Sequence, residues 1–132
     1  MSIGLELYKK AKVYLYMHEK THNSVLKNLL KLNPAKIAWC ARFINALLEE
    51  MGIKGTDSNL ARSFLKMKNA KKVEYPKKGD IVIFKRGLPW QGHVSIFVRE
   101  TPTHIYCLGG NQANSVCIKA YRRNKVLGYR RL

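Results

Sequence analysis

Two short runs in the second half of the chain decide the fold: DIVIF at 80–84 and GHVSIFVRE at 92–100. Both are rich in β-branched and aromatic residues and are separated by turn residues, which is typical of neighbouring β-strands. Three similar runs follow, HIYCLG (104–109), SVCIKAY (115–121) and KVLGYRR (125–131). The second half therefore predicts a sheet of about five strands.

The first half of the chain predicts helices instead. Apolar residues recur at helical spacing in about residues 3–17, and the Asn-Ser pair at 23–24 offers N-cap chemistry for a second helix. AWCARFINALLEEMGI (38–53) predicts a third helix and TDSNLARSFLKM (56–67) a fourth. Helices followed by a run of strands indicate the α+β class, with N-terminal helices packed on a C-terminal antiparallel sheet.

Length and charge limit how many domains the chain can form and which partners it can bind. The 132 residues fit one domain, 1–132. Lysine and arginine number 25 against 8 aspartates and glutamates, a formal net charge of +17. That charge predicts an anionic partner: nucleic acid, a membrane surface or bacterial cell wall. Lysines interrupt the first 20 residues, so we expect no secretory signal and synthesis in the cytoplasm.

HEKTH, His18 to His22, matches H-E-x-x-H, in which two histidines one helical turn apart hold zinc. An Asn-Ser pair with capping chemistry follows at once, so we expect the five residues to straddle a helix boundary. Catalytic zinc also needs a third protein ligand, and the candidates, Glu49 and Glu50, resemble solvated charges. We interpret both histidines as surface residues and keep a zinc hydrolase as an alternative.

Cys40 opens the predicted third helix. Backbone N–H groups and the positive end of the helix dipole would face its sulfur there. This setting is expected to lower the thiol pKa from about 8.5 toward neutrality and so to favour the nucleophilic thiolate. The other interpretation of Cys40 is a small buried apolar residue.

The other two cysteines, Cys107 and Cys117, lie among apolar and β-branched residues. We interpret both as buried structural thiols. Three cysteines without a C-x-x-C pair also argue against a full disulfide framework.

His93 lies near the start of the predicted strand 92–100. A histidine on a strand edge beside a cysteine at a helix N-terminus is the nucleophile–base arrangement of papain-like enzymes. Such a base needs a polar group that fixes its tautomer.

Hairpin pairing of strands 92–100 and 104–109 predicts which polar group that is. The register places Asn111 opposite His93, with its neighbour Gln112 second, and a shift of one residue would exchange them. His104 falls opposite about Glu100, which at about 3.3 Å per residue lies more than roughly 20 Å from His93. His104 is therefore excluded.

Five segments occur in one order: AWCARFINALLEEMGIKGTDSNLARSFL (38–65), PKKGDIVIFKRG (76–87), WQGHVSIFV (90–98), LGGNQANSV (108–116) and VLGYRR (126–131). Together they resemble the small NlpC-like and CHAP-type cysteine hydrolases of bacterial cell wall, in the compact form common in phages. The likeness runs from about Trp39 to Arg131 and covers the N-terminal helices loosely. It implies a papain-like fold and hydrolysis of peptidoglycan.

By residue, the resemblance implies Cys40 as nucleophile, His93 as base and Asn111 as the third polar group. Glu19 falls where relatives carry a Glu-containing loop that faces the cleft, so it would line the site without binding a metal. Gly109 departs from the CHAP pattern, which often has Glu at this position. A second departure is that 132 residues leave no room for a cell-wall-binding domain.

The implied chemistry is thiol catalysis without a cofactor. The Cys40 thiolate attacks an amide of the stem peptide or the amide that joins muramic acid to alanine, and His93 protonates the leaving amine. The backbone N–H of Cys40 would serve the oxyanion hole. The expected substrate-binding residues are Trp39, Trp90, Gln91, Gln112 and Glu19, with core packing as the other interpretation of each tryptophan.

Two questions of context stay open from the sequence. The expected enzyme, a monomer, acts in the periplasm or on the cell wall, either as a released phage lysin or as an effector delivered into a competitor. The rival class is a nucleic-acid-binding module, because YRRNKVLGYRR (121–131) combines cations with aromatic rings. Against it, positive charge is spread over the whole chain and no nucleic-acid motif appears.

Overall fold

A computed structural model describes residues 2–132. It has the α+β order that the sequence predicts, with helices first and strands after them. The elements are α1 (Ile3–Lys12), α2 (Asn23–Leu30), α3 (Cys40–Glu50), the 3₁₀ helix η1 (Ala61–Lys66), β1 (Lys71–Val73), β2 (Ile81–Lys85), β3 (Gly92–Glu100), β4 (His104–Gln112), β5 (Ser115–Arg122), the 3₁₀ helix η2 (Arg123–Lys125) and β6 (Val126–Arg131). Among the helices of this described part, none has the length and apolar character needed to cross a bilayer.

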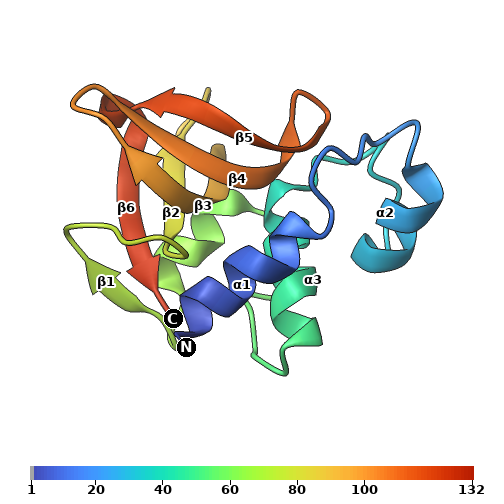
Figure 1. Cartoon of the computed structure of the whole chain (residues 1–132), viewed down its shortest axis with the longest axis horizontal. Helices are drawn as coiled ribbons and strands as arrows, with labels where there is room; N and C mark the ends of the chain where they lie inside the picture. The colour runs from blue at the N-terminus through green and yellow to red at the C-terminus, as the bar shows by residue number, and fades with distance from the viewer. Residues whose placement is uncertain (1) are drawn as a thin grey trace.

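The strands form one antiparallel sheet in the order β1-β6-β2-β3-β4-β5 (Figure 1). It contains six strands in the described residues, rather than about five, because β1 also pairs with β6, with Lys71 opposite Arg131. The sequence gives no alternation of apolar and polar residues in β1, which is short and largely exposed. Its pairing with β6 alone defines it as a strand.

The sheet separates two apolar clusters. Along β3, Val94 and Ile96 belong to the larger cluster, which includes most of α3 and parts of α1 and α2. The smaller cluster gathers on the other face around Phe84 and Phe97 and is covered by Tyr121. Successive side chains of a strand point to opposite faces, so the alternation in GHVSIFVRE serves both clusters.

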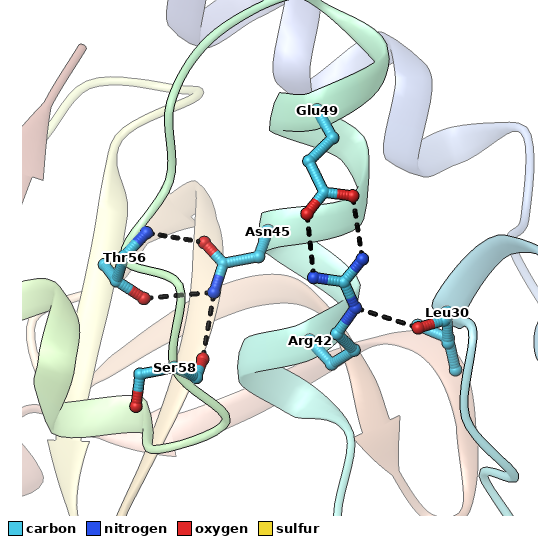
Figure 2. A network of polar contacts seen from close by, with 6 residues as sticks. All are labelled: Leu30, Arg42, Asn45, Glu49, Thr56 and Ser58. Carbon is cyan, nitrogen blue, oxygen red and sulfur yellow. Dashed lines mark hydrogen bonds and ion pairs between the residues drawn. The ribbon is translucent and has the colours of Figure 1, made fainter.

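Helix α3 packs against β3 and β4, and α1 packs on α3 and β4. Figure 1 shows α2 set apart from the sheet, and its contacts are with α3. The Arg42 guanidinium joins these helices: Nε donates to the Leu30 backbone oxygen at 2.8 Å, and both terminal nitrogens donate to the Glu49 carboxylate (Figure 2). The end of α2 is thereby held to α3.

Asn45 holds the segment that follows α3. Its amide, 2% exposed, donates to Thr56 Oγ1 at 3.0 Å and to the Ser58 backbone oxygen at 2.9 Å, and its oxygen accepts from the Thr56 N–H at 2.9 Å (Figure 2). These bonds and the positive φ of Asp57 keep residues 56–60 out of a helix. The predicted α-helix over 56–67 is therefore wrong, and only the 3₁₀ helix η1 forms.

The first helix is also shorter than predicted. It ends at Lys12, because the following turns lead Tyr16 into a left-handed conformation (φ 71°). The Tyr16 N–H then donates to the Val116 backbone oxygen at 2.7 Å. Contact with β5 replaces the last turn of the predicted helix and brings the following residues to the end of the sheet.

Candidate active site

Cys40 is the first residue of α3, as predicted, and is 7% exposed. It borders a hollow of about 250 Å³ between the start of α3, the segment before η1 and the β2–β3 turn. The lining residues are Ala38, Cys40, Asn59, Leu60, Ala61, Arg86, Trp90, Gln91, Gly92 and Asn111. A substrate in this hollow would meet the thiol at the N-terminus of a helix.

The sulfur of Cys40 lies at the edge of β3. The backbone N–H of Val94 lies close enough to this sulfur to lower the thiol pKa. The ladder between β3 and β4 stops at the pair Ile96–Leu108, so on that side Val94 has no strand partner. The thiol therefore occupies the gap that β4 leaves beside β3, one residue after His93.

The predicted low thiol pKa is not what the surroundings of Cys40 produce. Burial raises the pKa of Cys40, and this outweighs the lowering by the N–H groups of Val94, Ala41 and Cys40 itself and by the Arg86 charge. Burial disfavours the charged form of any acid. The resting side chain is therefore a neutral thiol.

His93 is completely buried and is held through its Nε2 atom. Nε2 lies 3.0 Å from Gln112 Oε1 and 3.1 Å from Ser95 Oγ, and the Ser95 hydroxyl also donates to Gln112 Oε1. Gln112 Nε2 donates to the backbone oxygens of Cys107 at 3.2 Å and Cys117 at 2.6 Å. The amide of Gln112 thus presents its oxygen, and not its nitrogen, to the imidazole.

This arrangement determines the tautomer of His93. An oxygen of Gln112 can only accept, so Nε2 of His93 carries the hydrogen and donates it. Nδ1 is then the atom with a free electron pair, and it is buried with no hydrogen-bond partner in the structure. Buried polar atoms without a partner are uncommon and need an explanation. This one leaves a buried imidazole nitrogen with a free electron pair.

The packing of His93 keeps its imidazole neutral. Its ring lies 6.0 Å from the ring of Phe84 and 5.4 Å from that of Tyr121, measured between centroids. Burial lowers the pKa of His93 to about 4, the bond to Gln112 opposes the shift, and the charges of Arg86 and Lys119 add to it. His93 is therefore a neutral imidazole with a free Nδ1 at physiological pH.

The thiol and the imidazole do not form a hydrogen bond in this structure, because Nδ1 has no partner. The His93 ring packs with Phe84 on the face away from α3, whereas Val94 packs against α3. The Cys40 sulfur, at the N–H of Val94, lies at the strand edge between the two faces. Cys40 and His93 therefore make no direct hydrogen bond across this edge.

The residue that orients His93 is Gln112, and the prediction of Asn111 is wrong for the hydrogen bond it was meant to make. The predicted register holds at Ile96–Leu108 and Phe97–Cys107, but a bulge shifts it by one residue at Glu100, which lies opposite Ile105 and not His104. Beyond Leu108, β4 is irregular between Gly109 and Gln112, and Asn111 adopts a left-handed conformation (φ 60°). This turns Asn111 toward the hollow and Gln112 toward His93.

The glycines of this segment leave room for the network. A Cβ on Gly109 would lie 2.2 Å from Ser95 Oγ and 2.8 Å from Gln112 Oε1. A Cβ on Gly110 would lie 2.6 Å from the ring of Trp39. Gly109, where the CHAP pattern often has Glu, thus leaves the space in which the side chains of Ser95 and Gln112 contact each other.

Trp39 and Glu19 do not lie on the open surface of the hollow. Trp39 is fully buried and packs edge-on against Phe43, so the prediction that it binds substrate is wrong and the core interpretation holds. Its Nε1 donates to Glu19 Oε1 at 3.1 Å. Glu19 is 8% exposed and borders a second, smaller hollow that shares Ala38 and Asn111 with the first.

Trp90 and Gln91 border the hollow, where the sequence analysis expects substrate-binding residues. Arg86, which no motif in the sequence singles out, borders it too and brings a positive charge to both Cys40 and His93. Ser95 was not predicted either. Its position two residues after His93, on the same strand face, was the available signal.

HEKTH lies in turns that end just before α2 and not within a helix, so it stops short of the helix boundary that it was predicted to straddle. Nδ1 of His22 accepts from the N–H of His18 at 3.1 Å, and Nδ1 of His18 accepts from the N–H of Lys20 at 3.0 Å. Glu49 is paired with Arg42. Among residues 2–132, no three His, Cys, Asp or Glu side chains gather in a way that could hold a metal.

The basic C-terminal run is partly used inside the protein. Arg131 binds the Asp80 carboxylate through two hydrogen bonds of 2.9 and 2.7 Å. Arg130 is 9% exposed and donates to the Leu65 backbone oxygen, and Arg123 pairs with Glu100. These three arginines are therefore only partly available to an outside phosphate.

The remaining cysteines and His104 lie outside the site. Cys107 is fully buried, as predicted, whereas Cys117 is half-buried and donates weakly to the Gln112 backbone oxygen at 3.4 Å. All three cysteines are free thiols. His104 begins β4, at its far end from Gln112, and contacts Thr103 instead.

The chain was compared with known proteins. No protein-family model matches it, and no curated protein matches it significantly.

Proposed function

We propose that the protein is a cysteine hydrolase that cleaves an amide bond of bacterial peptidoglycan, with Cys40 as nucleophile, His93 as base and Gln112 as the residue that orients the base. The observation that carries this proposal is the free Nδ1 of a buried His93 whose Nε2 is fixed by Gln112. A thiol at a helix N-terminus lies at the adjacent strand edge. The papain-like fold belongs to the same proposal.

In the proposed reaction, Cys40 starts as a neutral thiol. As Sγ attacks the amide carbonyl, its proton passes to Nδ1 of His93, and the imidazolium then gives this proton to the leaving amine. Water hydrolyses the acyl-enzyme with His93 again as base. The N–H groups of Cys40 and Ala41 lie near the sulfur, and in this proposal they donate to the oxyanion.

The surroundings of the thiol support a polar, peptide-like substrate. Asn59 and Asn111 offer amide groups in the hollow, and Arg86 offers a cation. The net charge of +17 would concentrate the protein on an anionic cell wall. Action in the periplasm or on the wall, as a released lysin or a delivered effector, follows from this substrate.

The test is digestion of purified peptidoglycan, with mass spectrometry of the soluble products. Wild-type protein should release fragments that carry a new amino terminus, and Cys40→Ala should release none. Cys107→Ala, a second buried thiol outside the site, is the matched control and should keep activity. The proposal is wrong if Cys40→Ala digests peptidoglycan as well as the wild type does.

A further inference from the structure

Residues 85–91, which are the last residue of β2 and the turn that leads to β3, present large apolar side chains to solvent. Leu88 is 55% exposed and Trp90 59%. Leu60, which borders the same hollow as Trp90, is 55% exposed. Isolated apolar residues are normal on a protein surface, but a large aromatic and an aliphatic side chain two residues apart on one tight turn suggest an interaction site.

This turn has a defined shape. The Leu88 N–H donates to Gln91 Oε1 at 2.8 Å, and the Gln91 N–H donates to the Leu88 backbone oxygen at 2.9 Å. Arg62 Nε donates to the Gln91 backbone oxygen at 2.5 Å. Gly87 takes a left-handed conformation (φ 57°) that the turn requires. The apolar side chains are therefore held outward at little further cost in conformational entropy on binding.

The same turn is strongly basic. Lys85 and Arg86 precede the apolar residues and are both exposed. The ion pairs found among residues 2–132 are Arg42–Glu49, Arg123–Glu100 and Arg131–Asp80. None of them involves Lys85 or Arg86, so these two charges are free to meet an external anion.

We propose that this turn, residues 85–91, docks the protein on an anionic phospholipid bilayer. Trp90 and Leu88 enter the boundary between headgroups and acyl chains, where tryptophan is enriched in membrane proteins. Lys85 and Arg86 pair with headgroup phosphates on the same side. Charge complementarity favours this partner over an uncharged one, since the turn has two cations and no acidic residue. Docking would bring the Cys40 hollow to the membrane surface.

Sedimentation with sucrose-loaded vesicles tests the docking at physiological salt. Vesicles that contain 30% phosphatidylglycerol should bind the protein, and vesicles of phosphatidylcholine alone should bind it far less. The double variant Leu88→Ser/Trp90→Ser should bind at least about tenfold more weakly, because burying one large apolar side chain changes an equilibrium constant by roughly one to two powers of ten. Val13→Ser, 71% exposed and outside this turn, is the apolar control and should bind like the wild type.

Tryptophan fluorescence gives a second readout, located at the turn itself. The chain has two tryptophans, and Trp39 is fully buried, so in Trp39→Phe the emission comes from Trp90 alone. Anionic vesicles should shift this emission to the blue, and brominated lipids should quench it. Cys40→Ala should dock as well as the wild type, which separates docking from the proposed hydrolysis.

Two results would overturn the docking proposal. One is an unchanged Trp90 emission on vesicles that do bind the protein, which would mean binding by net charge alone. The other is equal loss of binding in Lys85→Gln/Arg86→Gln and in the charge-matched control Lys71→Gln/Lys72→Gln on β1. A third result would also overturn it. If soluble peptidoglycan fragments shift the Trp90 emission and vesicles do not, the turn binds substrate and not the membrane.

Discussion

The side-chain oxygen of Gln112 lies 3.0 Å from Nε2 of His93, and this contact determines which imidazole nitrogen is free to accept a proton. Gln112 is itself fixed by two backbone oxygens of β4 and β5. The orientation of the His93 imidazole therefore depends on strands β4 and β5 of the sheet.

Removal of this contact should reduce catalysis without unfolding the protein. We expect Gln112→Ala to lower kcat by about tenfold or more, because loss of tautomer control in a protease triad costs up to roughly 10⁴-fold. The matched control is Asn111→Ala, which removes the neighbouring amide from the hollow and should mainly raise KM. Gln112→Glu should move the acid limb of the pH profile upward, since a carboxylate favours the imidazolium. A larger loss of kcat in Asn111→Ala than in Gln112→Ala would contradict this assignment.

The pH profile of hydrolysis should reflect the low pKa of His93. The base must be neutral to accept the thiol proton, and its pKa in the folded protein is about 4. We therefore expect kcat/KM to hold from neutral pH down to about 5 and to fall through about pH 4. An acid limb near pH 6.5, the ordinary value for histidine, would mean that His93 is not the essential base.

Stability should fall with acid for the same reason. The unfolded chain binds a proton at His93 at about pH 6.5, whereas the folded protein does so only at about 4. The stabilisation from neutral His93 is complete above pH 6.5 and is lost as the pH falls toward 4, by about 3 kcal/mol in total. Denaturant titrations of wild type and His93→Gln at pH 7 and pH 4.5 measure it. The other three histidines are common to both proteins, so equal pH dependence would contradict the prediction.

Asn45 should be important for stability. Asn45→Ala removes three hydrogen bonds and leaves the Thr56 N–H without its partner, so we expect a loss of about 2–4 kcal/mol in the free energy of unfolding. Asn28→Ala, an exposed asparagine of α2, is the control and should change it by less than about 0.5 kcal/mol. Urea unfolding compares the two variants. Similar midpoints would show that the Asn45 network contributes little.

Chelation should leave hydrolysis unchanged. His18 and His22 bond to local N–H groups and lie outside a helix, so we expect the double variant His18→Ala/His22→Ala to keep activity within about twofold. Incubation with EDTA before the assay should have no effect. Loss of activity in both experiments, with recovery on addition of zinc, would favour a metal hydrolase.

The helices-then-strands order, the start of α3 at Cys40 and the strand that carries His93 could all be predicted from the sequence. These features depend on local signals, such as alternation along a strand or capping at a helix end. The hydrogen bond between Gln112 and His93 could not be predicted, because it depends on an irregularity of β4 between Gly109 and Gln112 that no turn motif in the sequence indicates. The pKa of Cys40 was predicted in the wrong direction, because the dipole of α3 is visible in a sequence and the depth of burial is not.

The place of β6 has a consequence for biosynthesis. It follows all the other strands in the chain but lies inside the sheet, between β1 and β2. Neither neighbour can complete its ladder while the ribosome has yet to add residues 126–131. A nascent chain that lacks these residues would thus expose the unpaired edges of β1 and β2. A separate peptide with the sequence of residues 126–131 could then pair with both edges and complete the sheet.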